Sequence, residues 1–136
     1  MTREELELFK TLNAQLKRKK EELRDLRLGM NSISSPGYFE RFQNGTRIHE
    51  ADFERSTDRC MQLEEEIRQE TFALFRKKHE IINAIHRVPS DRLSEILYQH
   101  YIKFVPLTEL ANREGIDRDN MYKLHKKALL ILENNH

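Results

Sequence analysis

The 136 residues are enough for one ordinary domain, or for one small domain joined to an extended helical segment. With 38% hydrophobic and 35% charged residues, 4 Gly, 3 Pro and no Trp, the composition favours long polar helices with narrow apolar seams over a thick core. A formal net charge of +1 excludes a polycation that binds nucleic acid through its overall charge, so any nucleic-acid site has to be local.

We therefore expect an all-α fold. The single cysteine, Cys60, cannot form an intramolecular disulfide, and no hydrophobic run is long enough for a secretory signal or a membrane span. These features predict a cytoplasmic protein that does not enter a membrane.

Residues 2–28 contain no Gly or Pro and predict a long helix. Apolar residues recur along it at alternating spacings of three and four, which is the pattern of a coiled-coil seam. Lys19 occupies one seam position, where a charge would weaken the pairing or help to fix its register. The apolar seam residues are Phe9, Leu12, Leu16, Leu23, Leu26 and Met30.

The next stretch is rich in Gly, Asn, Ser and Pro between Gly29 and Gly45, and predicts a loop that we assign to residues 29–50. Tyr38, Phe39 and Phe42 lie within it. Because exposing three aromatic side chains to water is unfavourable, we expect part of this loop to fold back onto the helices.

A second long helix is predicted from about residue 51 to residue 88, too long to be buried in one small globule. We expect it to pair with the first helix as an antiparallel hairpin over residues 1–88 and to form a homodimer as well. One series of apolar residues at seven-residue spacing, which we assign to oligomerisation, comprises Phe53, Cys60, Ile67, Leu74 and Ile81. The first helix can cover only part of the second, and we expect the remaining apolar residues to contact either the C-terminal domain or a second subunit. These residues are Phe72, Phe75, Ile82 and Ile85.

Residues 89–136 form the expected second domain. Pro89 ends the long helix and Ser90 is a suitable N-cap for the next one, which we expect to run to about Phe104. Pro106 then suits the first position of a short helix that continues to Arg113.

A sharp turn is predicted at Gly115, where the backbone needs a positive φ. Ile116 is placed to fill the junction between two helices, and Ala111 is small enough for those helices to approach closely. Asp117 is expected to cap the last helix. Its buried stripe is predicted as Met121, Leu124, Ala128 and Leu132. The spacing of a helix-turn-helix, in which the second helix enters the major groove of DNA, is reproduced by Leu110, Ala111, Gly115, Ile116, Met121 and Leu124. Glu114 departs from the pattern, because an apolar residue is usual there.

The segment LTELANREGIDRDNMYKLHKKALLIL, within residues 90–134, resembles region 4 of the bacterial sigma factors, which binds promoter DNA with this motif. The whole layout, including IKFVPLTELA and MYKLHKKAL, is similar to the ArpU/RinA-like regulators of phages that infect Gram-positive bacteria. This resemblance implies a sequence-specific DNA-binding transcriptional regulator, an activator of late phage genes, with double-stranded DNA as partner and RNA polymerase as a further one.

If sigma-type docking applies, the base-contacting residues are Arg118, Asp119, Tyr122 and Lys123, and the phosphate-contacting residues are His125, Lys126 and Lys127. Arg118 can bind guanine bidentately. Asp119 could accept a hydrogen bond from cytosine, or only favour the start of the helix through its dipole. Residues 118–127 hold four Lys or Arg and one Asp, a local positive excess typical of a groove-binding helix.

Three other interpretations are open: a helical hairpin with no DNA role, a small terminase subunit for DNA packaging, and an adaptor that imitates sigma region 4 on RNA polymerase. We expect no enzyme, cofactor or small-molecule substrate. The consecutive carboxylates of residues 64–66 point around a helix, and His79 and His86 are two turns apart, so no metal site is predicted. Cys60 suits a buried apolar thiol better than a nucleophile.

Overall fold

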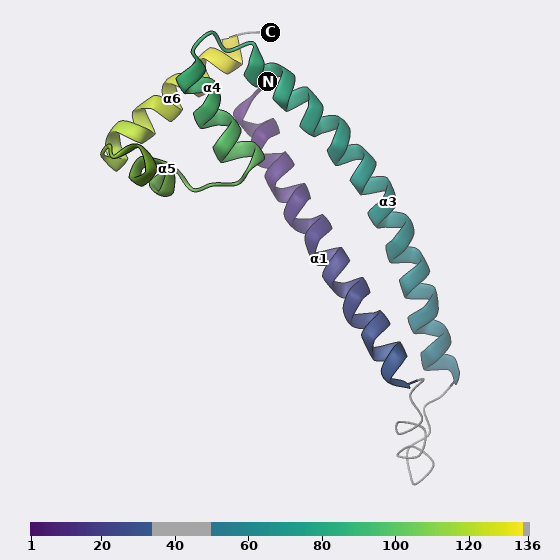
Figure 1. The fold of residues 1–136 in the computed structure, drawn as a ribbon. Coiled ribbons are helices and arrows are strands. Elements are labelled where there is room, and N and C mark those ends of the chain that lie inside the picture. Colours follow the sequence, from purple (N-terminus) through teal and green to yellow (C-terminus); the bar gives the residue numbers. More distant parts are fainter. Residues whose placement is uncertain (34–49, 135–136) are drawn as a thin grey trace. The chain divides into compact units, whose positions relative to one another are not determined.

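The computed structural model describes residues 1–33 and 50–134, and every regular element within these ranges is helical (Figure 1). The expected all-α fold is confirmed. None of the described helices combines the length and the apolar character needed to cross a bilayer. The elements are α1 (Arg3–Ile33), α3 (Glu50–His86), α4 (Asp91–Leu97), the π-helical turn η1 (Tyr98–Ile102), α5 (Leu107–Glu114) and α6 (Arg118–Asn134).

The chain divides into two compact units, and both long helices contribute to each of them. One unit combines Met1–Asn13 with Ala73–His136, and the other is Ala14–Phe72. This division differs from the boundary after residue 88 that the sequence suggested. The difference arises because the first turns of α1 pack in the unit that contains Ala73–His136, which we call the C-terminal unit. There the ring of Phe9 stacks on that of Phe104, with 6.1 Å between the ring centroids.

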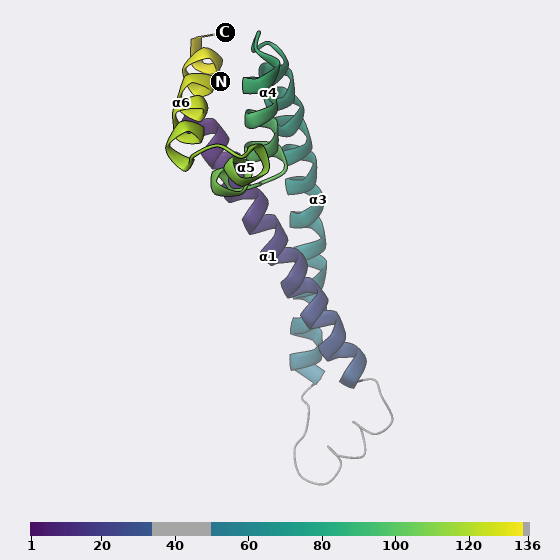
Figure 2. The same cartoon turned by 60° about the vertical axis from the view of Figure 1, so that its left-hand side comes forward.

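In the Ala14–Phe72 unit, α1 and α3 lie side by side and antiparallel, as Figures 1 and 2 show. Leu23, Cys60 and Leu63 are buried between them. Leu26, Met30 and Ile67 pack against this cluster, and the sulfur atoms of Cys60 and Met30 are 3.7 Å apart. Cys60 is therefore a buried apolar side chain of the pair, as its heptad position indicates.

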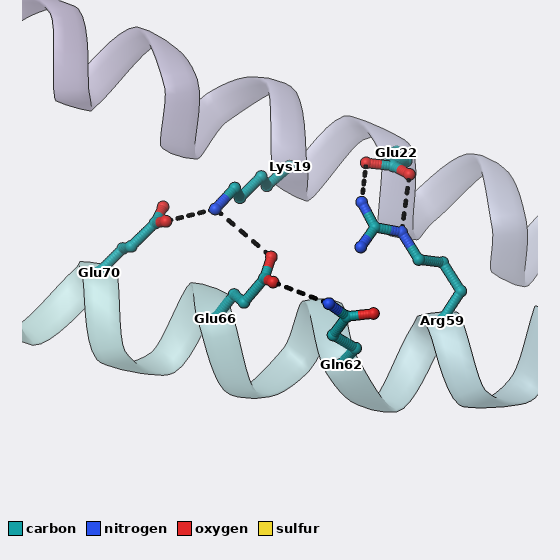
Figure 3. A network of polar contacts seen from close by, with 6 residues as sticks. All are labelled: Lys19, Glu22, Arg59, Gln62, Glu66 and Glu70. Atoms are coloured by element: carbon teal, nitrogen blue, oxygen red, sulfur yellow. Dashed lines mark hydrogen bonds and ion pairs between the residues drawn. The ribbon is translucent and has the colours of Figure 1, made fainter.

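Lys19, the charged seam residue, faces carboxylates of α3 (Figure 3). Its ammonium group donates to Glu70 and lies 3.4 Å from Glu66, and these contacts raise the pKa of Lys19. Nearby, Arg59 donates to both carboxylate oxygens of Glu22, at 3.1 and 3.2 Å. Half-exposed ion pairs add little stability, but opposite charges at these positions favour this register over a shifted one.

The three consecutive carboxylates on α3 have three different cationic partners. Arg27 donates to Glu64, Arg68 pairs with Glu65 at 2.6 Å, and Lys19 lies beside Glu66. The three carboxylates point in different directions around the helix and do not converge, as predicted. Among residues 1–33 and 50–134, no three His, Cys, Asp or Glu side chains gather as a metal ion would require.

The predicted start of the loop at Gly29 is wrong, because α1 continues to Ile33. Glycine within a helix costs about 1 kcal/mol relative to alanine. Leu26 and Met30, on either side of Gly29, pack against the Cys60 cluster, and this burial offsets that cost. Tyr38, Phe39 and Phe42, which we expected to fold back, lie outside the described residues.

Most of the residues assigned to oligomerisation are covered by other parts of the same chain. Cys60, Leu74 and Ile81 are buried, and Ile67 is half-buried against the Cys60 cluster. This assignment is corrected for these four residues, because packing within the single chain already covers them: α1 covers Cys60 and Ile67, and Leu74 and Ile81 are buried within the unit that contains the C-terminal helices. Phe53 remains exposed.

The C-terminal unit is built around α6, against which both α4 and α5 pack. The Ser90 side chain accepts a hydrogen bond from the backbone N–H of Leu93 and so caps α4, as predicted. Pro106 is the N-cap of α5, one residue before the position that we expected. One core cluster of this unit comprises Ile96, Leu107, Leu110, Ala111 and Met121, with Val105, Ile116 and Leu124 packed against it.

The single helix expected to reach Phe104 is instead interrupted. After α4 the chain widens into η1, where the N–H of Lys103 bonds to the carbonyl of Tyr98 at 3.2 Å, five residues back. Phe104 then adopts a φ of 58°, which is strained for a residue with a side chain. The nearly parallel rings of Phe104 and Phe9, 16° apart, stabilise this conformation.

Candidate nucleic-acid interface

The bend between α5 and α6 is a Schellman motif centred on Gly115. Gly115 has φ 68° and ψ 30°, which confirms the predicted positive φ. Its N–H bonds to the carbonyl of Asn112 at 3.3 Å, and the N–H of Ile116 bonds to the carbonyl of Ala111 at 3.1 Å. Both Ala111 and Ile116 join the core cluster. The turn thus ends α5 completely and starts α6 in a new direction.

The predicted base-contacting residues lie on the exposed side of α6. Arg118, Asp119, Tyr122 and Lys123 are all exposed, and Tyr122 leaves 46% of its surface accessible. The opposite side of α6 is buried through Met121, Ala128 and Leu132, as the stripe predicts, whereas Leu124 is half-buried. Lys126 and Lys127 are also exposed. The first two turns of α6 therefore present polar side chains away from the core.

The cations of α6 differ from those of the neighbouring helices in their pairing. Arg92 of α4 lies 3.1 Å from Glu114, and Arg113 of α5 lies 2.8 Å from Glu109. In the part of the chain that the structure describes, no ion pair involves the α6 cations, which are Arg118, Lys123, Lys126 and Lys127. The positive charge of this helix is thus available to an anionic partner. Glu114, the residue that departs from the motif, is accommodated at the surface by Arg92.

His125 was expected to reach phosphate, and the structure corrects this assignment. Its side chain is buried, and its Nε2 atom is 2.8 Å from the hydroxyl oxygen of Tyr101. Burial lowers the pKa of His125 to about 4, with smaller contributions from His100 and Arg3. The imidazole is therefore neutral near pH 7. Its position, four residues after Met121 and three before Ala128, already places it on the buried stripe.

Tyr101 and His100 complete this aromatic cluster beneath α6. Burial raises the pKa of Tyr101 to about 12, and Glu7 adds to the shift, so the hydroxyl stays protonated. The ring of His100 lies 5.2 Å from that of His125. His100 donates from Nδ1 to the carbonyl oxygen of Val105 at 2.8 Å, because a carbonyl can only accept. The cluster joins α6 to η1 and the residues after it.

A depression beside α6 includes residues that the motif analysis missed. It takes in Tyr122 from α6, Thr108 from α5 and, from the first helix, Lys10. No local signal marks Lys10, because only the packing of α1 in this unit brings it near α5 and α6. The remaining lining residues are His100, Phe104, Pro106 and Leu107.

Comparisons of the chain with models of protein families, with curated proteins and with solved structures found no match.

Proposed function

We propose that the protein is a sequence-specific DNA-binding transcriptional regulator whose α6 helix enters the major groove. The observation that carries this proposal is the exposed, cation-bearing start of α6, which follows a Schellman turn and packs on α4 and α5 through its opposite side. A helix in the major groove needs both a rigid support and a free polar side, and this arrangement provides the two together.

The individual roles follow from the chemistry of the exposed side chains. Arg118, in the first turn of α6, can donate two hydrogen bonds to guanine O6 and N7. Lys123 can do so with less geometric restriction, and Asp119 can accept from cytosine N4. Lys126 and Lys127, further along the helix, suit contacts to phosphate, which set affinity and position without specifying sequence.

The resemblance of residues 90–134 to sigma region 4 supports the same docking mode. We further propose an ArpU/RinA-like activator of phage genes, with RNA polymerase as a second partner. A dimer is also proposed, and its contact would have to use residues that the α1–α3 pairing leaves free. Phe72 and Phe75 on α3 are 59% and 60% exposed, and they are available for such a contact.

The test begins with selection of a preferred duplex from a random pool by the full chain at a stated salt concentration. Binding of the selected duplex and of single-base variants is then compared for wild type, Arg118→Ala and the control Arg76→Ala. We expect Arg118→Ala to lose roughly ten- to hundredfold discrimination at one base pair, the value of one bidentate contact. Arg76 is exposed on α3, and its removal should change nothing.

Equal affinity of the wild type for all duplexes would contradict the proposal, as would unchanged discrimination in Arg118→Ala. The solution mass of the chain supplies a second test. A dimer agrees with a regulator, whereas a ring of many copies would favour the terminase alternative. RNA polymerase binding without any duplex preference would favour the adaptor.

A further inference from the structure

The depression beside α6 has the chemistry of an anion site. Lys10, Thr108 and Tyr122 line it, and their side chains carry an ammonium group and two hydroxyl groups that can donate hydrogen bonds. None of the described residues that line it is a carboxylate. Phe104, Pro106 and Leu107 form its apolar part.

Lys10 is free to act in this way. Within residues 1–33 and 50–134, Lys10 takes part in no ion pair, unlike Lys19 and Lys77, which have carboxylate partners. Its backbone is also held in place, because the preceding residue, Phe9, is only 3% exposed and stacks on Phe104. The strained φ of Phe104 is thus part of the contact that keeps the start of α1 beside the depression.

Tyr122 links this depression to the proposed base-contacting side of α6. It lines the depression, and it lies four residues after Arg118, on the same side of the helix. An anion bound by Lys10 would therefore lie beside the groove into which Arg118 reaches. A backbone phosphate of the same duplex is the anion that such a position fits.

We propose that Lys10, assisted by the hydroxyl of Thr108, binds a backbone phosphate of the DNA, so that the N-terminal helix extends the interface beyond the helix-turn-helix. This inference rests on the proposed function. It assigns a binding role to the first helix in addition to its pairing with α3. The start of α1 belongs to the same compact unit as α6, as this role requires.

The experiment measures affinity for the selected duplex by fluorescence anisotropy across a salt series, with the full chain as wild type, Lys10→Gln, Thr108→Ala and Lys78→Gln. Lys78 is an exposed lysine of α3 in the same unit that does not line the depression, so Lys78→Gln controls for the loss of one charge. We expect Lys10→Gln to weaken binding about fivefold near 0.15 M salt and to reduce the slope of log K against log salt by about 0.9. Thr108→Ala should weaken binding less and leave the slope unchanged.

The two proposals fail in different ways. A salt slope for Lys10→Gln equal to that of wild type and of Lys78→Gln, in a protein whose discrimination still depends on Arg118, overturns this inference alone. Loss of base discrimination in Lys10→Gln would also overturn it, because a phosphate contact carries no sequence information. If wild type shows no duplex preference, both proposals fall together. Far-UV circular dichroism and the urea midpoint establish that each variant is folded.

Discussion

Replacement of His125 by Gln should remove a pH dependence of stability that the buried imidazole causes. In the folded protein the pKa of His125 is about 4, chiefly because of burial, whereas an unperturbed histidine titrates near 6.5. Arg3 and His100 also disfavour its charged form, and the hydroxyl of Tyr101 stays protonated beside it. The folded state therefore binds this proton less readily than the unfolded state does.

The sign and the size of the effect follow from this difference. Between pH 6.5 and pH 4, His125 binds a proton in the unfolded chain but stays neutral in the folded chain. The free energy of unfolding therefore falls as the pH falls. Above pH 6.5 the contribution is fully present. Over the whole window, the depressed pKa of His125 corresponds to a loss of about 3 kcal/mol, an order-of-magnitude figure.

Urea unfolding followed by circular dichroism from pH 7.5 to pH 4 measures this loss in wild type, His125→Gln and the control His86→Gln. Gln cannot titrate, but its amide can still pair with the Tyr101 hydroxyl. The stability gap between wild type and His125→Gln should shrink as the pH falls. His86 is exposed, and its variant should follow wild type. Parallel curves for wild type and His125→Gln would refute a depressed pKa at this position.

Two further substitutions test the turn and the helix pair. Gly115→Ala should lower the free energy of unfolding by about 1–2 kcal/mol, because a Cβ there meets no atom within 4 Å and the cost is only that of a positive φ. Gly115→Asn should cost less, and a larger loss than this in a urea titration would indicate a packing role. Lys19→Leu should raise the urea midpoint by continuing the seam between Leu16 and Leu23, while Lys17→Leu on the exposed side should not. A lower midpoint for Lys19→Leu would mean that the ion pairs with α3 outweigh the added apolar contact.

The elements that could be predicted are those whose causes are local. The heptad spacing around Leu23 and Cys60 follows from the period of the helix, and it correctly indicated two long helices that pack together. The Ser90 cap and the Gly115 turn follow from single residues whose chemistry suits one backbone geometry. The exposed positions of Arg118 and Lys123 follow from the same helical period.

The errors concern features that depend on contacts between distant residues. The sequence predicts a helix end at Gly29, but packing of α1 on α3 extends the helix past it. The positive φ of Phe104 accompanies a ring contact with Phe9, which is far away in sequence. His125 lies on the buried side of α6 by its helical position, but the hydroxyl that pairs with its imidazole comes from Tyr101, 24 residues earlier, and sequence spacing does not reveal that partner.

By itself, the sequence of this protein determined its helical class, the positions of its sharp turns and the polar side of its last helix, because propensity, capping and periodicity act within a few residues. Only the tertiary structure decided which surface covers the α3 seam, that His125 is removed from solvent, and that Lys10 lies beside α5 and α6. These outcomes depend on which side chains meet after the chain has folded back, and a one-dimensional pattern does not contain that information.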